Sequence, residues 1–242
     1  MQNAKTTGLV WFRNDLRVRD QKSLSQAIAA HDRVIAVYHF PEHWLQPTQW
    51  GFKKMEGFRA EFLLQTLAQL QKDLAKLNIS LWVKVGRLGA LLKELQETYN
   101  VTAIYGQKEW TQEEQITTDT LKKNISEKVV LHSFYDQFLF HPDDLTIEIE
   151  SLPEVFTVFR KKCEKLVTVR SCYNNIQPLP IENTLIQEDK IPSLEDFDLL
   201  PFEKNQKTAS KTKANKHIEK ARSQGGEWRR VAGSEVGSGP LK

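Results

Sequence analysis

A dense cluster of charges follows the first apolar run of the sequence. Residues 9–12 read LVWF, and residues 13–20 (RNDLRVRD) hold three arginines and two aspartates. Parallel sheets place their ligands at the carboxyl ends of strands, which is where this cluster would lie. The alternative is that the arginines are solvated or paired with the aspartates. We assign Arg13, Asp15 and Arg17 to a structural ion-pair cluster and give them no catalytic role.

The other candidate residues lack the spacing of a phosphate-binding loop, a metal site or a nucleophilic site. The sequence contains neither G-x-G-x-x-G after its first apolar run nor G-x-x-x-x-G-K-[ST] anywhere, so both phosphate-binding fingerprints are missing. His39 and His43 are four residues apart, but Pro41 between them argues against a shared helical face and a metal site. Cys163 and Cys172 have no activating base nearby in the sequence. We therefore expect no metal site and no nucleophilic catalysis.

Alternating strands and helices must position whatever site exists. Strand-length runs rich in β-branched and aromatic residues alternate with helical patterns, which predicts βαβ units with right-handed crossovers. The expected fold class is α/β, with a doubly wound, five-stranded parallel sheet whose core includes Trp11 and Trp82. The predicted strands are 8–12, 33–39, 79–85, 101–105 and 129–134, and the predicted helices are 21–30, 54–77, 88–99, 111–124 and 154–166.

Composition limits the class of protein. The chain has 242 residues, of which 40% are hydrophobic, and this content is typical of a folded protein and not of a disordered one. No apolar run approaches the roughly 18 residues that span a bilayer, and the N-terminus lacks a signal-peptide pattern. We expect a cytoplasmic protein. The net charge of +3 permits anionic partners without requiring them.

The amino-acid composition of the chain changes after about residue 170. Residues 1–170 are expected to form the α/β domain, and residues 171–224 a proline-punctuated linker followed by a basic segment. The lysine-rich stretch 204–222 suggests weak nonspecific contact with DNA, although a solvated tail is the alternative. Residues 225–242 are rich in glycine and serine, which predicts a disordered tail.

Several segments resemble one protein family. Residues 9–24, LVWFRNDLRVRDQKSL, are similar to the opening of the photolyase/cryptochrome family, W-F-R-x-D-L-R-x-x-D-x-x-x-L. Residues 105–115 (YGQKEWTQEEQ), 139–145 (LFHPDDL) and 152–165 (LPEVFTVFRKKCEK) resemble the DASH-type cryptochromes. The resemblance covers residues 8 to about 180 and implies the Rossmann-like N-terminal domain of that family.

The resemblance also implies a ligand. In this family the α/β domain carries a light-harvesting antenna, usually 5,10-methenyltetrahydrofolate. The matching positions are Glu109, whose carboxylate would accept hydrogen bonds from the pterin ring, and Phe40, which would give apolar cover. The alternatives are a solvated Glu109 at the start of the helix from residue 111 and a core position for Phe40.

The family's second domain is helical, binds FAD and docks damaged DNA, and no segment of this chain resembles it. Residues 225–227 match the DASH sequence that leads into the helical domain, whereas the following WRRVAGSEVGSGPLK has no counterpart. We therefore expect a disrupted reading frame or a truncated product just past Glu227. The chain alone would then not perform the family's blue-light-dependent repair of pyrimidine dimers, which needs FAD.

Three readings of function follow from the sequence. The first is the N-terminal part of a DASH-type cryptochrome or photolyase, limited to binding the antenna, with self-association through apolar surface that loss of the helical domain would expose along the linker. The second is a non-enzymatic folate- or nucleotide-binding Rossmann-like module that acts through a partner. The third is a remnant that retains no ligand.

Overall fold

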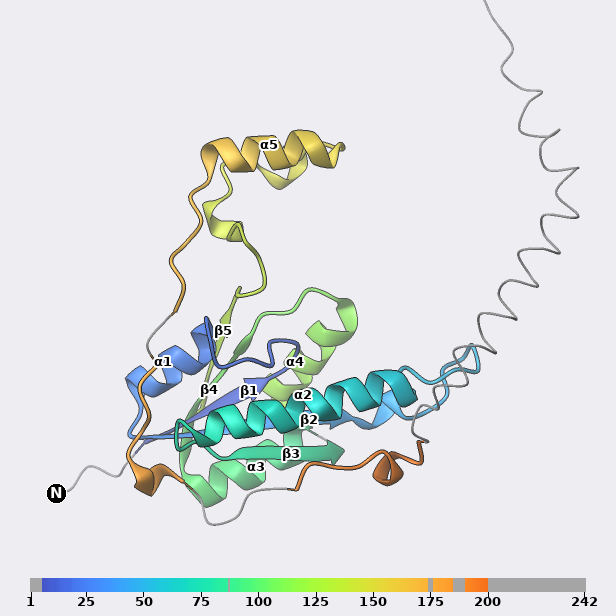
Figure 1. The fold of residues 1–242 in the computed structure, drawn as a ribbon, viewed down its shortest axis with the longest axis vertical. Helices are drawn as coiled ribbons and strands as arrows, with labels where there is room; N and C mark the ends of the chain where they lie inside the picture. The colour runs from blue at the N-terminus through green and yellow to red at the C-terminus, as the bar shows by residue number, and fades with distance from the viewer. Residues whose placement is uncertain (1–5, 87, 174–175, 185–189, 200–242) are drawn as a thin grey trace, which may run out of the picture. The chain divides into compact units, whose positions relative to one another are not determined.

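Five parallel strands form one sheet in the order β3-β2-β1-β4-β5 (Figure 1). The computed structural model describes residues 6–86, 88–173, 176–184 and 190–199, so the expected basic segment and tail lie outside the described residues. Each strand overlaps a predicted one, which confirms the prediction of a five-stranded parallel sheet. The strands are β1 (Thr7–Phe12), β2 (Arg33–Pro41), β3 (Leu81–Gly86), β4 (Val101–Gln107) and β5 (Val130–Phe134).

Helices cover both faces of this sheet, as the doubly wound prediction requires. Leu24 of α1 and Leu67 of α2 belong to one buried cluster, and Leu91 of α3 and Leu121 of α4 belong to the other. None of the described helices is long and apolar enough to cross a membrane. The helices are α1 (Lys22–Ala30), α2 (Gly57–Ala75), α3 (Leu88–Tyr99), α4 (Gln112–Asn124) and α5 (Phe156–Leu166).

Strand residues alternate between the two clusters because successive side chains point to opposite faces of a sheet. In β1, Val10 and Phe12 pack with α1 and α2, whereas Leu9 and Trp11 pack with α3 and α4. A strand buried on both faces must be apolar throughout, which explains the uninterrupted run LVWF. Trp11 is 4% exposed and Trp82 is 5% exposed, so the prediction that both lie in the core is confirmed.

The first turn of α4 is anchored firmly after β4. The Thr111 hydroxyl accepts a hydrogen bond from the Glu114 backbone N–H, and the Glu114 carboxylate accepts in return from the Thr111 backbone N–H and hydroxyl. This capping box satisfies helix donors that would otherwise lack partners. It also fixes the position of the side chains that α4 presents beside the carboxyl end of β4.

The segments 176–184 and 190–199 pack back onto the α/β domain. Asn183 is 4% exposed, accepts from the Val34 backbone N–H at 2.9 Å and donates to the Val34 and Asn78 carbonyls at 2.9 and 2.7 Å. The described residues up to Leu199 form one compact unit. The expected domain boundary at residue 170 therefore lies inside that unit.

Candidate functional site

The order of the strands reverses between β1 and β4. The chain passes from β1 through β2 to β3 on one side and then returns to place β4 beside β1 on the other. In open α/β sheets, ligands bind outside the carboxyl ends of the strands at such a switch point. The residues that follow β1 and β4, including the expected site residue Glu109, lie at this edge.

Glu109 lines a pocket of about 530 Å³ between the ends of β1, β4 and β5 and one side of α4. Apolar and polar groups both contribute to its wall, among them Trp11, Lys108 and Lys122. A volume of this size falls in the range of roughly 300–1,000 Å³ that is usual for small-molecule sites. We call this hollow the Glu109 pocket.

Two side-chain amides hold one oxygen of the Glu109 carboxylate. Asn14 Nδ2 donates to Glu109 Oε1 at 3.1 Å, and Gln107 Nε2 donates to the same oxygen at 3.0 Å. Asn14 Nδ2 also donates to Glu114 Oε1 at 2.9 Å and so joins the two carboxylates. Within the described residues, Glu109 Oε2 accepts no hydrogen bond and is not sealed from solvent. One carboxylate oxygen is thus satisfied by the protein while the other remains open.

Burial disfavours a charge on Glu109. The residue is only 8% exposed, and burial raises the pKa of its carboxyl above the ordinary value. The neighbouring Glu114 carboxylate raises the pKa further, whereas Arg13 and the amide donors act in the opposite direction. A buried carboxylate with one free oxygen and a raised pKa favours an incoming hydrogen-bond donor.

Two of the three arginines after β1, Arg13 and Arg17, bind neighbouring elements. Arg13 donates to Thr118 Oγ1 at 2.9 Å and to the Glu114 carbonyl at 3.1 Å, so it links β1 to α4. Arg17 Nη2 lies 3.4 Å from Asp136 Oδ2, beyond β5. The expected ion-pair cluster of Arg13, Asp15 and Arg17 is therefore corrected, because no salt bridge joins these three side chains within the described residues. Arg17 donates to the carbonyl of its neighbour Asp20 at 2.9 and 3.1 Å and pairs with the distant Asp136.

Asp15 is a buried carboxylate that closes the turn after β1. It is 2% exposed, accepts from the Arg13 backbone N–H at 2.9 Å and accepts from Gln21 Nε2 at 2.6 Å. Burial is the main reason that the pKa of Asp15 is raised. Its two hydrogen bonds fix the turn that brings Asn14 within hydrogen-bonding distance of Glu109.

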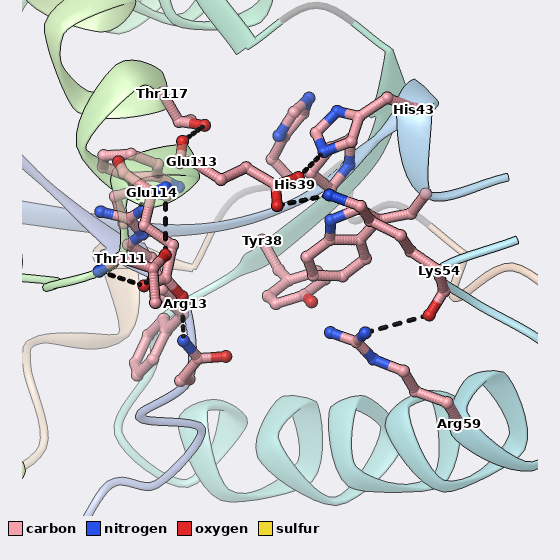
Figure 2. Close-up of a pocket in the computed structure, with 15 residues that line it drawn as sticks. Arg13, Tyr38, His39, His43, Lys54, Arg59, Thr111, Glu113, Glu114 and Thr117 are labelled. Carbon is pink, nitrogen blue, oxygen red and sulfur yellow. Dashed lines mark hydrogen bonds and ion pairs between the residues drawn. The ribbon is translucent and has the colours of Figure 1, made fainter. Parts of the chain in front are cut away.

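A second hollow lies on the other side of α4 (Figure 2). It measures about 150 Å³, lies at the ends of β1 and β2, and is lined by cationic and aromatic side chains that include Arg13, Arg59 and Tyr38. Glu113 projects from α4 between His43 and Lys54, binds the imidazole, and accepts from Lys54 Nζ at 2.5 Å. We call this hollow the Glu113 crevice.

The Glu113 bridge divides the crevice from a larger, more open hollow of about 1,030 Å³, which the same three side chains also line. Hydrogen bonds from Lys54 and His43 lower the pKa of the Glu113 carboxyl. At about 150 Å³ the crevice is smaller than most ligand sites. His39, the other crevice histidine, binds the Gly86 carbonyl, and burial lowers its pKa.

Phe40, the second expected site residue, lies elsewhere. None of its side chain is exposed, and its ring lies 4.9 Å from that of Phe197 and 4.9 Å from that of Tyr38. These contacts match the alternative in which Phe40 is a core residue, because the ring of Phe197 already packs where a ligand would have to contact Phe40. Phe40 does not line the Glu109 pocket.

Asn14 and Gln107 are the site residues that sequence reasoning missed. Both follow from the switch-point rule, since Asn14 comes two residues after β1 and Gln107 ends β4. The rule needs the spatial order of the strands, which the linear sequence does not contain. Among the described residues, no group of three or more histidine, cysteine, aspartate or glutamate side chains is arranged to hold a metal ion.

The fold and the site together define an α/β domain with a pocket at its switch point. A family model described as DNA photolyase matches residues 8–181, which is more than half of the chain. The chain therefore belongs to the DNA photolyase family, and the resemblance seen in the sequence is confirmed. A protein named Cryptochrome DASH from Gloeobacter violaceus is 34% identical over 197 residues, which cover 80% of this chain and 39% of that protein.

Solved structures agree with this assignment. The cryptochrome of Synechocystis sp. PCC6803 superposes with a TM-score of 0.73 at 32% identity and covers 84% of this chain and 42% of its own. An archaeal photolyase from Sulfolobus tokodaii, solved with two FAD molecules, has a TM-score of 0.55 at 26% identity and covers 68% of this chain and 36% of its own. The chain thus spans about two fifths of the length of the relatives it matches.

Proposed function

We propose that this chain is the antenna-binding α/β domain of a DASH-type cryptochrome or photolyase and that the Glu109 pocket binds 5,10-methenyltetrahydrofolate. The observation that carries the proposal is the open Oε2 of a buried carboxylate in a pocket of about 530 Å³. Pterin rings present N–H and amino donors, and a carboxylate is a strong acceptor for such donors. When bound, the folate would absorb near-ultraviolet light and pass the energy to a flavin.

The remaining wall of the pocket suits the other parts of this ligand. Lys108 and Lys122 line the pocket and are cations of the kind that bind the carboxylates of a folate tail. Trp11 also lines it, with the Arg13 guanidinium 4.5 Å from the centre of its ring.

Equilibrium binding of methenyltetrahydrofolate tests the proposal. We expect the wild-type chain to bind with an absorption band in the near-ultraviolet to violet. Glu109→Ala should weaken binding by about tenfold to a hundredfold, because a hydrogen bond to a charged group contributes about 1.5–3 kcal/mol. Glu97→Ala, an exposed glutamate on α3 away from the pocket, is the matched control. Equal affinities of wild type and Glu109→Ala would contradict the site.

The role of the whole protein is a further part of this proposal. The relatives named Cryptochrome DASH are more than twice as long as the matched segment, and the family role is blue-light-dependent repair of pyrimidine dimers or light sensing. A helical domain that binds FAD and damaged DNA would supply that chemistry. The present residues would then contribute light harvesting, with no catalytic residue of their own.

Helix α5 supports the expectation of a partner or of self-association. Only Cys163 of this helix is buried, whereas Phe156 is 71% exposed and Leu166 is 54% exposed. Exposed apolar side chains grouped on one element favour association. Light scattering across a concentration series should show dimers or larger species, and a monodisperse monomer at high concentration would contradict self-association.

Nucleotide or flavin binding at the Glu113 crevice is the second candidate function. The favouring observation is its place at the ends of β1 and β2 together with the adjoining hollow of about 1,030 Å³. A photolyase of similar fold was solved with two FAD molecules. Flavin absorption bands in the purified chain, retained by Glu109→Ala, would favour this candidate over the folate site.

A further inference from the structure

The open oxygen of Glu109 results from how its other oxygen is held. A carboxylate oxygen accepts about two hydrogen bonds, and Asn14 and Gln107 already supply two donors to Oε1. Both donors are neutral amides, so they occupy Oε1 without neutralising the charge. Further donors must therefore approach Oε2.

Gln107 is fixed from inside the fold. The residue is 5% exposed and lines the Glu109 pocket, while its Oε1 is sealed from solvent and has no partner within the described residues. A flip of its amide would take Nε2 away from Glu109 and place an acceptor against the carboxylate. Because a ligand in the pocket does not reach the sealed Oε1, Gln107 acts on the pocket only through the bond from its Nε2 to Glu109 Oε1.

Asn14 couples this arrangement to the start of α4. Its Nδ2 donates to Glu109 at 3.1 Å and to Glu114 at 2.9 Å, and Glu114 is itself fixed by the capping box with Thr111. The amide of Asn14 is thus held by two carboxylates, those of Glu109 and Glu114. The charged groups that act on Glu109 are Glu114 on α4 and Arg13 after β1.

We propose that Asn14 and Gln107 are positioning residues that hold Glu109 Oε1, leave Oε2 open to the pocket, and so select ligands with neighbouring N–H donors. This inference rests on the proposed function of the Glu109 pocket and names the residues that give it specificity. A 2-amino-4-oxopyrimidine ring, as in a pterin, has such an edge. A flavin ring, with acceptors flanking its one imide N–H, fits this arrangement less well.

A double-mutant cycle tests the inference on the intact chain. Binding of methenyltetrahydrofolate is measured for Asn14→Ala and Gln107→Leu, each in the wild-type and the Glu109→Ala background. We expect each substitution to weaken binding about tenfold in the wild type and less than about twofold beside Glu109→Ala, because the effect passes through the carboxylate. Asn14 is exposed, so Asn14→Ala should fold even if Gln107→Leu does not. Asn124→Ala, an exposed asparagine near the end of α4, is the control.

The outcomes separate this inference from the proposed function. Equal losses in both backgrounds would mean that the two amides act independently of Glu109 and would overturn the inference while the folate site stands. If the wild type binds no folate, the proposed function fails. The positioning role of the two amides is then tested separately, by NMR titration of the Glu109 carboxyl in the variants. Loss of either amide donor should then raise the pKa of that carboxyl, and an unchanged pKa would overturn the positioning role.

Discussion

Glu109 and Glu113 are only four residues apart, yet their surroundings are opposite. Glu109 is buried, is held by neutral amides on one oxygen, and has a raised pKa. Glu113 is 44% exposed at its side chain, is bridged by His43 and Lys54, and has a lowered pKa. The first turn of α4 and the residues before it place one carboxylate on each side of the helix.

The kind of partner, and not the presence of a carboxylate, distinguishes the proposed ligand site from a structural bridge. In Glu113 each carboxylate oxygen has a protein partner, His43 on Oε1 and the Lys54 ammonium on Oε2. Amides on Glu109 leave both its charge and one oxygen without a full complement of partners.

Loosening the turn after β1 should have the largest effect. Asp15→Ala removes a buried acceptor from the Arg13 backbone N–H and from Gln21 Nε2, leaving both donors unpaired. We expect the free energy of unfolding to fall by about 2–4 kcal/mol, measured by urea denaturation. Asp73, a partly exposed carboxylate that pairs with Lys76 on α2, is the control, and Asp73→Ala should cost less than about 1 kcal/mol. A similar cost for both substitutions would show that the buried turn has no special role.

The affinity for folate should depend on pH through Glu109. The ionised carboxylate is the better acceptor, so affinity should fall as pH drops through its pKa, by up to about tenfold per pH unit. Because that pKa is raised above the ordinary 4.5, the loss should begin at a higher pH than for a normal glutamate. Titrations of wild type and Glu109→Gln at several pH values check this. The same pH profile in both proteins would exclude Glu109 as the titrating group.

The two glutamine substitutions should change stability in opposite directions. Burial penalises the charge of Glu109, so at neutral pH Glu109→Gln should raise the free energy of unfolding by about 1 kcal/mol or less, and the gain should vanish in acid. The lowered pKa of Glu113 means that its charge stabilises the fold above the unfolded pKa, so Glu113→Gln should lose stability at neutral pH only. Denaturation curves at neutral and acidic pH measure both, and changes of the same sign would remove the contrast.

Removing one cation from the Glu113 bridge should have the smallest effect. Lys54 and Glu113 are both partly exposed, and pairs of this kind contribute about 1 kcal/mol or less. Lys54→Met should therefore lower the thermal midpoint only slightly, and the difference should disappear in about 1 M salt because exposed charges are screened. A large loss that salt does not reduce would show that Lys54 acts through packing.

Much of the fold was predictable because burial on both faces leaves a clear record in the sequence. The five apolar runs became the five strands, and the helical patterns between them became α1 to α5 with boundaries shifted by a few residues. Trp11 and Trp82 were placed correctly in the core since they sit inside those runs.

The site was harder to predict because its partners are distant in the sequence. Glu109 came from a family resemblance, whereas Asn14 reaches it across 95 positions and Gln107 reads as an ordinary strand residue. Arg13 and Arg17 also found partners that local spacing does not suggest, on α4 and beyond β5. Local sequence does not encode which strands become neighbours.

Phe40 shows the same limit, since its burial depends on contact with Phe197, more than 150 positions later in the sequence. The return of Phe197 and Asn183 to the β2 region has a practical consequence for any shortened version of this polypeptide. Ending the chain at residue 170 would expose the ring of Phe40 and remove both hydrogen bonds that Asn183 makes with the Val34 backbone. Both changes favour aggregation and proteolysis. The smallest piece worth expressing for crystallisation or ligand screening therefore extends at least to Leu199.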